Sequence, residues 1–457
     1  GNGNGRKRKH LETSTLIQNA TVMTPQGPAA ADVWVENGVI KSVGLSLKAP
    51  GAKVLDAKGL TLIPGAIDPQ VHFREPGMEW KEDLGTGSRA AAAGGVTGFL
   101  EMPNTSPPTV TVELMAAKKK IAASKCLVNY NFFIGATPEG LPDLLSTPNV
   151  CGIKIFMGAS TGSLLVDKLA DLDRIFSQGR RLIAVHAEDE ALIRENKARY
   201  AGVTGVENHA LIRSPEVALR ATRIAVELSR KYNRRLHILH MTTQEEAEYL
   251  ATMKSGLPVS AEVCPQHFLL HAPECYDNLG TYAQMNPPLR EKRHGEALWH
   301  ALKTGVIDCI ATDHAPHTRE EKDKGFPHAP SGMPGVETAL PLMLNRVNQG
   351  LCTLAEVVKW MCGNPARLYG LKNKGRIQEG YDADLVLLDM HREKTIENGK
   401  LQTKVNWSPY NGWKTKGWPV VTMVNGNVVY REGEFFTEAL GREMTIDAPW
   451  ERGEAFP

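Results

Sequence analysis

Polar residues that can bind metals or transfer protons follow a series of apolar runs in the middle of this chain of 457 residues. His72 and Arg74 come just after one such run, and Asp313 comes after another, far along the chain. Histidine, aspartate and lysine side chains gathered at one place are what a metal-assisted hydrolase needs. The same pattern recurs at Glu101 and Asn104, at Lys154, at His186, at His237 and His240, at Gln266 and His267, and at His314 and His317.

Each of these residues also has an ordinary structural explanation. A histidine at the end of a strand is more often a hydrogen-bonded structural residue than a metal ligand. Lys154 could extend its amine to solvent or pair with a carboxylate, and Asp313 could cap a helix. These explanations are independent of one another, and all of them would have to hold at the ends of five strands. The sequence therefore favours a shared metal site.

Lys154 lies within the apolar run Gly-Ile-Lys-Ile-Phe-Met-Gly, and this setting has a chemistry of its own. A buried lysine loses the solvation that stabilises its ammonium form, so its amine can become a neutral nucleophile. Reaction with carbon dioxide would give a carbamate, a carboxylate-like group able to bridge two metals about 3.5–4 Å apart. Carbamylation of Lys154 is therefore a hypothesis for a two-metal site.

Residues so far apart in the chain need an architecture that brings many strand ends together. A helix is expected to begin at Ser214-Pro215, and another at the capping-box pattern from Thr242 to Glu245. Strands alternating with helices predict an α/β fold, and their number favours a closed (β/α)8 TIM-like barrel, in which strand ends share one rim. The expected strands are the apolar runs at about 61–73, 96–104, 127–136, 150–158, 181–189, 234–242, 257–270 and 305–315.

The two ends of the chain show a different pattern from the middle. Short alternating runs with turn residues such as Asn37-Gly38 occur before residue 63 and recur at 375–389 and 420–435. Because a terminal strand pair alone would be marginally stable, we expect the two ends to pair. The predicted domains are a flexible tail at 1–14, a composite β-sandwich from 15–63 and 373–457, and a barrel from 64–372.

Composition excludes several classes of protein. The chain is 42% hydrophobic and 23% charged, as in globular domains, and no apolar run approaches the roughly 20 residues that span a bilayer. Its 53 basic and 51 acidic residues create no overall field that favours nucleic acid or an anionic membrane. Seven widely spaced cysteines without a CxxC pair indicate free thiols in a reducing cytoplasm.

Several motifs resemble those of dihydroorotases in the amidohydrolase superfamily. The motifs are D-x-x-x-H-F-R-E-P-G from Asp68 to Gly77, MPNT, GIKIFMGAS, HAEDE, HILHMTT, QMNPPLR and ATDHAPHTREE. The resemblance extends over about residues 15–450. It implies a zinc-dependent barrel enzyme that reversibly hydrolyses the cyclic amide of L-dihydroorotate to N-carbamoyl-L-aspartate in de novo pyrimidine biosynthesis.

The same resemblance implies roles for individual residues. Asp313 would be the catalytic residue, which takes a proton from the attacking water. One or two zinc ions would be held by His72, Lys154 (carbamylated as a bridge), His186, His240 and Asp313. The substrate would be held by Arg74, Asn104, Asn286, His317, Ser331 and Gly332, with Arg74 and Asn104 on its carboxylate. A planar guanidinium suits a carboxylate because it can donate two parallel hydrogen bonds.

One position departs from the pattern of the family, because Gln70 stands where the D-x-H-x-H motif has its first histidine. A glutamine carbonyl oxygen is a weaker zinc ligand than a neutral imidazole. This leaves open one tight metal, two metals with the first depleted, or a catalytically silent dihydroorotase-like subunit. Because the other site residues are present, we favour an active enzyme.

Alternatives to a dihydroorotase remain within the superfamily and outside it. Allantoinases and hydantoinases act on related cyclic amides, but their substrates lack a ring carboxylate for Arg74 and Asn104 to bind. A non-catalytic scaffold, such as a structural partner of aspartate transcarbamoylase, would account for Gln70. We expect a cytoplasmic homo-oligomer, most simply a dimer, with a small-molecule substrate and no nucleic-acid or membrane partner. The charged segment 318–335 could be a lid or an ordered rim loop.

Overall fold

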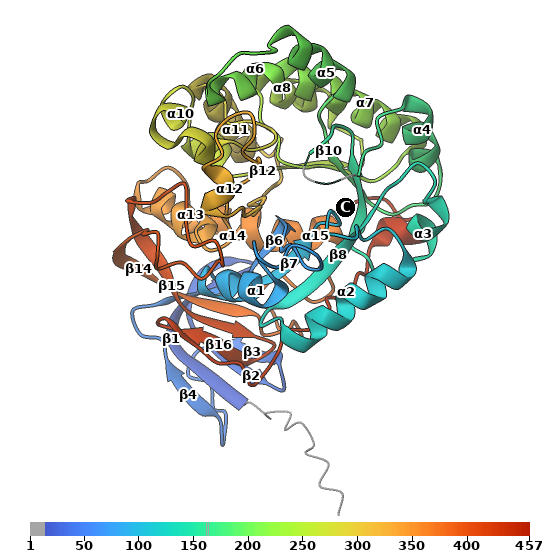
Figure 1. Cartoon of the computed structure of the whole chain (residues 1–457). Helices are drawn as coiled ribbons and strands as arrows, with labels where there is room; N and C mark the ends of the chain where they lie inside the picture. The colour runs from blue at the N-terminus through green and yellow to red at the C-terminus, as the bar shows by residue number, and fades with distance from the viewer. Residues whose placement is uncertain (1–13, 161, 163) are drawn as a thin grey trace, which may run out of the picture.

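The computed structural model describes residues 14–160, 162 and 164–457, which form a barrel with a second sheet beside it (Figure 1). In these residues the barrel sheet has eight parallel strands, in the order β13 to β6. Each strand lies inside one of the predicted apolar runs, so the predicted (β/α)8 barrel is confirmed. The strands are β6 (Ala66–Val71), β7 (Val96–Glu101), β8 (Asn129–Gly135), β9 (Gly152–Phe156), β10 (Ile183–His186), β11 (Leu236–Ile238), β12 (Val259–Val263) and β13 (Cys309–Ile310).

Main-chain contacts between the first strand and the segment after the last one bring the barrel close to closure. The His72 amide donates to the carbonyl oxygen of His314 at 2.7 Å, and Val71 forms a parallel bridge with His314. Every residue of the strands from β6 to β13 is buried. The carboxyl ends of these strands therefore meet at one rim, as the barrel fold requires.

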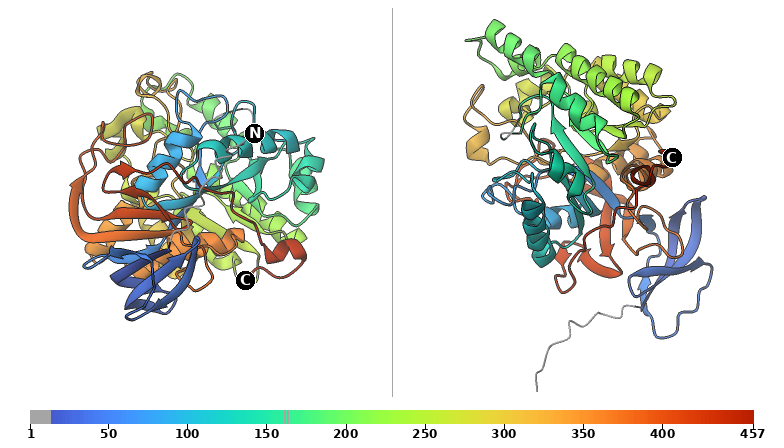
Figure 2. Two further views of the ribbon diagram at one scale, coloured as in Figure 1. Left: turned by 90° about the horizontal axis from the view of Figure 1, so that it is seen from below. Right: turned by 90° about the vertical axis from the view of Figure 1, so that its right-hand side faces the viewer.

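Helices cover the outer surface of the barrel (Figures 1 and 2). As predicted, α7 is capped by Ser214, whose hydroxyl accepts from the Val217 amide at 3.4 Å. The helix predicted at the Thr242 capping box begins one residue later, because Thr243 accepts from the Glu246 amide at 3.0 Å. The helices are α1 (Leu84–Ala93), α2 (Val112–Lys125), α3 (Leu141–Ser146), α4 (Leu169–Ser177), α5 (Glu190–Arg199), α6 (His209–Ile212), α7 (Pro215–Tyr232), α8 (Gln244–Met253), α9 (Gln266–Leu269), α10 (Glu274–Leu279), α11 (Lys292–Thr304), α12 (Arg319–Lys322), α13 (Ala339–Asn348), α14 (Leu354–Val358) and α15 (Asn364–Tyr369).

The second sheet combines strands from both ends of the chain, as expected. In the described residues its order is β17-β16-β15-β14-β5-β1-β2-β3, with β4 paired to β1. The predicted hairpin at Asn37-Gly38 joins β2 to β3, and both turn residues have positive φ angles of 53° and 79°. The strands are β1 (Ser14–Thr24), β2 (Gly27–Glu36), β3 (Val39–Gly44), β4 (Lys53–Asp56), β5 (Thr61–Pro64), β14 (Leu385–Thr395), β15 (Lys414–Val424), β16 (Asn427–Arg431) and β17 (Glu434–Phe435).

Two of the predicted boundaries differ from the structure. The apolar run at 61–73 is divided at Gly65, because β5 pairs in the second sheet and β6 pairs in the barrel. A Cβ atom on Gly65 would lie only 1.9 Å from Thr97 Oγ1, so this crossing point requires glycine. The predicted tail lies outside the described residues except for Ser14, which belongs to β1.

After β17 the chain leaves the second sheet and runs along the barrel. Tyr130 of β8 forms a bridge with Glu443, and Trp450 is buried in a cluster with Ile67 and Leu100 of the barrel strands. Figure 2 shows the C-terminus beside the barrel. The last residues therefore belong with the barrel in space.

Two observations concern the cysteines and the membrane. All seven cysteines are buried and free, which confirms the prediction of free thiols. Within the described part of the chain, none of the helices has the length and apolar character that crossing a membrane requires.

Candidate active site

The predicted site residues line one small cavity of about 20 Å³ at the carboxyl ends of the barrel strands. Because β6, β7, β9, β10, β11 and β13 each contribute a residue from their ends or from the loops that follow, the cavity depends on the whole barrel. A larger cavity of about 530 Å³ shares the lining residues Ser160, Asn286 and Ser331 with it. The predicted residues in the small cavity are His72, Arg74, Asn104, Lys154, His186, His240, Asn286, Asp313, Ser331 and Gly332, together with Gln70.

His72 lies between two acceptor oxygens. Its Nδ1 is 2.7 Å from Asn104 Oδ1, and its Nε2 is 3.0 Å from Asp313 Oδ1. Burial lowers the pKa of His72 to about 4, so the ring is neutral near pH 7 and carries a single N–H. In one of the two contacts, a ring nitrogen without hydrogen therefore faces an oxygen without hydrogen. A cation bound between two such atoms would stabilise this arrangement.

Asp313 is an ionised carboxylate at the centre of the site. Burial raises the pKa of Asp313. The hydrogen bond and the electrostatic interaction with His72, together with the interactions with His240 and Lys154, outweigh burial and bring the pKa to about 2. Its Oδ1 also accepts from Gln70 Nε2 at 3.2 Å. Asp313 has a positive φ of 49°, an uncommon conformation for a residue with a side chain. This carboxylate is therefore fixed in place and free of a proton at neutral pH.

His186 and His240 form the opposite side of the cavity, with their ring centroids 4.6 Å apart. His186 Nε2 lies 2.6 Å from Glu188 Oε1, and Glu188 also accepts from Arg213. Burial raises the pKa of Glu188, but Arg213 and His186 outweigh it and hold the pKa at about 2. An ionised Glu188 fixes the tautomer of His186 by accepting from its Nε2–H, which leaves Nδ1 as the donor atom for a metal.

Lys154 ends in the same cavity, surrounded by weak partners. Its Nζ lies 3.3 Å from Met102 Sδ and 4.3 Å from the centre of the Phe156 ring. Burial lowers the pKa of Lys154 to about 8, while Asp313 and Glu262 act in the opposite direction. A buried amine with no direct carboxylate partner in the described residues is the setting that carbamylation needs.

The site contains buried donor atoms that lack partners, although they do not form a ready ligand cluster. Among the described residues, no three His, Cys, Asp or Glu side chains form a group that could hold a metal ion. Two buried atoms of the site, Gln70 Oε1 and His240 Nδ1, have no hydrogen-bond partner. Buried polar atoms without partners are costly unless something else satisfies them. These atoms, with His72 Nε2 facing Asp313, are suited to a cation.

A second group of charges surrounds Arg74, which is 1% exposed. Its Nε donates to the carbonyl oxygen of Pro316 at 3.1 Å, and its Nη2 lies 3.3 Å from Nε2 of the buried His317. Burial lowers the pKa of Arg74 to about 10, so the group stays charged. His317 does not line the small cavity itself, but it contacts Arg74, which does.

Lys81 fixes the protonation of His317. Its Nζ lies 2.7 Å from His317 Nδ1 and 3.1 Å from Glu321, while His317 Nε2 lies 2.9 Å from the carbonyl oxygen of Ser331. Since an ammonium only donates, Nδ1 must accept and Nε2 must carry the proton. Burial lowers the pKa of His317 well below its usual range, and Arg74 and Lys81 lower it further. The result is a neutral histidine between two cations.

The remaining predicted residues form the outer wall. Asn286 Oδ1 lies 2.9 Å from His209 Nε2, and its Nδ2 donates to Ser160 at 3.3 Å. Gly332 has a φ of +146°, and a Cβ atom there would lie 2.4 Å from the Ala315 carbonyl oxygen and 2.9 Å from the His317 ring. Glycine is therefore required at this position.

Not every polar strand-end residue reaches the site. His237 lies 2.9 Å from Glu262, His267 contacts the Pro287 carbonyl oxygen, and His314 lies 3.0 Å from Glu82, so these three are structural. Conversely, the sequence analysis did not identify Lys81, Glu188 or Arg213. Glu188 was detectable as the carboxylate of HAEDE next to His186, whereas Lys81 and Arg213 come from loops with no periodic signal.

Comparisons with known proteins agree with this geometry. A family model described as the amidohydrolase family matches residues 61–429. Relatives named dihydroorotase include those of Methanosarcina acetivorans, 34% identical over 96% of both chains, and of Halalkalibacterium halodurans, 35% identical over 92% of this chain and 99% of the relative. The solved L-hydantoinase (dihydropyrimidinase) from Arthrobacter aurescens has a TM-score of 0.91 and 29% identity, covering 95% of this chain and 100% of its own. The chain belongs to the amidohydrolase family and is a hydrolase that acts on cyclic amides.

Proposed function

We propose that this enzyme is a dihydroorotase, which interconverts L-dihydroorotate and N-carbamoyl-L-aspartate. The observation that carries the proposal is the buried cation Arg74, which lines the cavity with the carboxylate of Asp313 and is supported from behind by the neutral His317 and by Lys81. L-Dihydroorotate is a cyclic amide that bears a carboxylate, so one end of it needs a cation and the other needs hydrolytic groups. The relatives named dihydroorotase support the same substrate.

The residues divide the work between binding and proton transfer. Arg74 donates to the substrate carboxylate, and Asn104 and the neutral His317 orient it. Water adds to the ring carbonyl carbon, the ring carbon–nitrogen bond breaks, and the departing nitrogen gains an N–H. The new carboxylic acid then releases its proton to solvent and becomes a carboxylate. Asp313 accepts the proton that water loses and delivers it to the departing nitrogen. Its pKa of about 2 keeps it ionised, and therefore without a proton of its own, at neutral pH.

A metal completes this scheme, and zinc is the ion that we propose. Its candidate ligands are His72, Lys154, His186, His240 and Asp313, with Gln70 beside them. A bound metal would supply Lewis acidity and lower the pKa of a coordinated water to about 7. The weak donor at Gln70 favours fewer than two full equivalents of metal per chain.

We propose that Lys154 is carbamylated when two metals are bound. Elemental analysis of purified Lys154→Ala protein tests this proposal. We expect this variant to lose metal and to regain it when acetate or propionate is added, because a short carboxylate can occupy the space of the carbamate. Full metal occupancy in Lys154→Ala without added acid would refute the bridge.

A catalytically silent subunit is the alternative that Gln70 raises. Elemental analysis together with an assay on L-dihydroorotate separates the two, because an active enzyme must contain metal and turn over this substrate. Metal-replete protein with no activity in either direction would overturn the proposed function. Dimer formation and association with aspartate transcarbamoylase remain predictions, which size-exclusion chromatography of the protein alone and of the mixture would test.

A further inference from the structure

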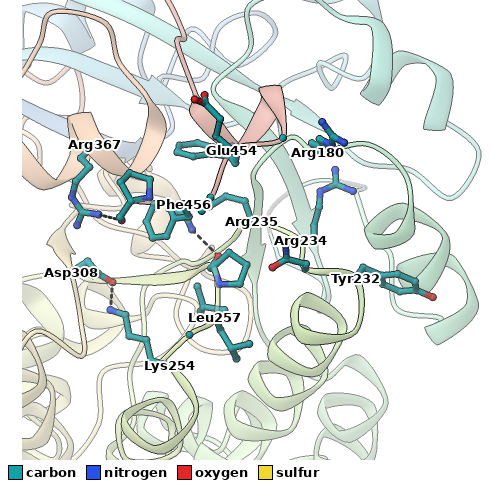
Figure 3. Close-up of a pocket in the computed structure, with 18 of the residues that line it drawn as sticks. Arg180, Tyr232, Arg234, Arg235, Lys254, Leu257, Asp308, Arg367, Glu454 and Phe456 are labelled. Atoms are coloured by element: carbon teal, nitrogen blue, oxygen red, sulfur yellow. Dashed lines mark hydrogen bonds and ion pairs between the residues drawn. The ribbon is translucent and has the colours of Figure 1, made fainter.

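A second cavity, of about 680 Å³, is drawn in Figure 3 and lies at the end of the barrel where the strands begin, opposite the candidate active site. Its wall is formed by the segments that enter the strands: Arg180 precedes β10, Arg234 and Arg235 precede β11, and Asp308 precedes β13. Trp450 and residues 453–457 line it from the other side. It shares no lining residue with the active-site cavity.

This cavity has a strong excess of positive charge. Its lining includes the cations Arg180, Arg234, Arg235, Lys254 and Arg367, against the two acidic side chains Asp308 and Glu454. Both acidic side chains already have a partner, because Asp308 pairs with Lys254 at 2.6 Å and Glu454 pairs with Arg452 at 3.1 Å. In the described residues, none of the four lining arginines has a side-chain carboxylate within 4 Å, and Arg367 instead donates to the main-chain oxygen of Pro457 at 2.9 Å.

Two of these guanidinium groups have buried nitrogen atoms without a hydrogen-bond partner. The atoms are Arg234 Nη2 and Arg235 Nε, and both side chains are only 2% exposed. Arg234 Nη1 donates to carbonyl oxygens at the end of α4, those of Ile175 and Phe176 at 3.0 Å and that of Gln178 at 2.6 Å, and Nε donates to the carbonyl oxygen of Arg181 at 2.7 Å. The free N–H of Arg234 is therefore held in position rather than mobile, and leaving it unsatisfied is costly.

Arg180 lines the same cavity, is exposed to solvent, and places its guanidinium beside Gly453, where an added Cβ would lie 2.5 Å from Arg180 Nη1. A Cβ atom on Gly179, its neighbour in the chain, would lie 3.8 Å from Arg234 Nη2, so the chain at Arg180 passes close to Arg234 at this wall (Figure 3). Glu451 is close enough to influence the pKa of Arg234, yet it forms no ion pair with it within 4 Å. Because the cations of this lining outnumber its acidic side chains, the cavity has a positive potential that attracts anions.

We propose that this cavity binds a small phosphate-bearing anion, with Arg180 and Arg234 holding the phosphoryl group. Phosphate matches the cluster because its oxygens accept several charge-assisted hydrogen bonds from guanidinium groups at once. The volume is within the range of small-molecule sites, and the lining residues Tyr232 and Leu257 offer apolar surface for the rest of a phosphate ester. The proposal does not depend on the identity of the substrate at the other end of the barrel.

Isothermal titration of the full chain with ADP, inorganic phosphate and adenosine tests this site. We expect ADP and inorganic phosphate to bind and adenosine not to bind, and tighter binding of ADP would identify a phosphate ester rather than the free ion as the ligand. Arg180→Glu should weaken binding of the phosphate-bearing probes at least about tenfold, because it removes charge-assisted hydrogen bonds and adds repulsion.

The matched control is Arg431→Glu, which makes the same charge change at an exposed arginine of β16 in the second sheet. This variant should bind the probes as the unaltered protein does. Both variants should also keep the hydrolytic kcat, since neither residue lies in the active-site cavity. The proposal is overturned if neither phosphate-bearing probe binds, or if Arg180→Glu and Arg431→Glu weaken binding equally.

Discussion

The two ends of the barrel use buried charge in different ways. At the carboxyl ends of the strands the cavity measures about 20 Å³, and histidines pair with carboxylates there, His72 with Asp313 and His186 with Glu188. At the amino ends the cavity measures about 680 Å³, and Arg234 and Arg235 instead donate to main-chain carbonyl oxygens.

This difference separates a reacting site from a binding site. At the first end, contacts with His72 and other basic groups keep Asp313 ionised, whereas burial and the nearby cations Arg74 and Lys81 keep His317 neutral at pH 7. At the second end the arginines support the protein backbone and retain positive charge that no side chain neutralises. The comparison predicts that substitutions at the first end change kcat or the KM for L-dihydroorotate, and the three effects below are ordered from the largest to the smallest.

Asp313→Asn should have the largest effect. The amide keeps the size of the side chain but cannot accept a proton, so kcat should fall by about 10²–10⁴-fold. Metal content and melting temperature should change little, because the contacts with Gln70 and His72 can still form. Steady-state kinetics with elemental analysis checks this. A kcat like that of the unaltered enzyme would contradict the role of Asp313.

Arg74→Lys should have the next largest effect, and it should appear in KM. A lysine keeps the charge but loses the planar pair of donors, so KM for L-dihydroorotate should rise about 30-fold. The same variant should alter turnover of 5,6-dihydrouracil, which has the same ring without the carboxylate, much less. An unchanged KM for L-dihydroorotate would exclude the proposed contact with the carboxylate.

Lys81→Met should have the smallest of the three effects. Lys81 acts through His317, so its loss should raise KM about fivefold while kcat stays nearly constant. Lys81→Arg should restore most of the affinity, because a guanidinium can also donate to Nδ1 of His317. If both variants lowered kcat and left KM unchanged, Lys81 would have a structural role instead.

Much of the fold and the first end of the barrel could be predicted from the sequence. Strand runs end in polar residues, and the barrel fold forces those ends to one rim, so His72, Lys154, His186 and Asp313 could be expected together. Hydrophobic periodicity does not show where a chain crosses between sheets, which is why the run at 61–73 was expected as one strand and is two.

The partners of the site residues were harder to predict, because they come from loops. Lys81 reaches His317 and Arg213 reaches Glu188 across long separations in the chain, and no spacing rule connects them. The cavity at the amino ends was missed for the same reason. Its arginines Arg180, Arg234 and Arg235 read as ordinary charged residues between a helix and a strand.

The central claim is that a carboxylate-binding subsite beside Asp313 selects the substrate of this cyclic amidase. Measuring kcat/KM for L-dihydroorotate and for 5,6-dihydrouracil with the same metal-loaded enzyme tests it directly. We predict a preference for L-dihydroorotate of about 100-fold or more, since Arg74 would otherwise remain buried without its anion. Equal values, or a preference for 5,6-dihydrouracil, would contradict the claim. Such a result would indicate a dihydropyrimidinase activity, like that named for the structurally similar enzyme from Arthrobacter aurescens.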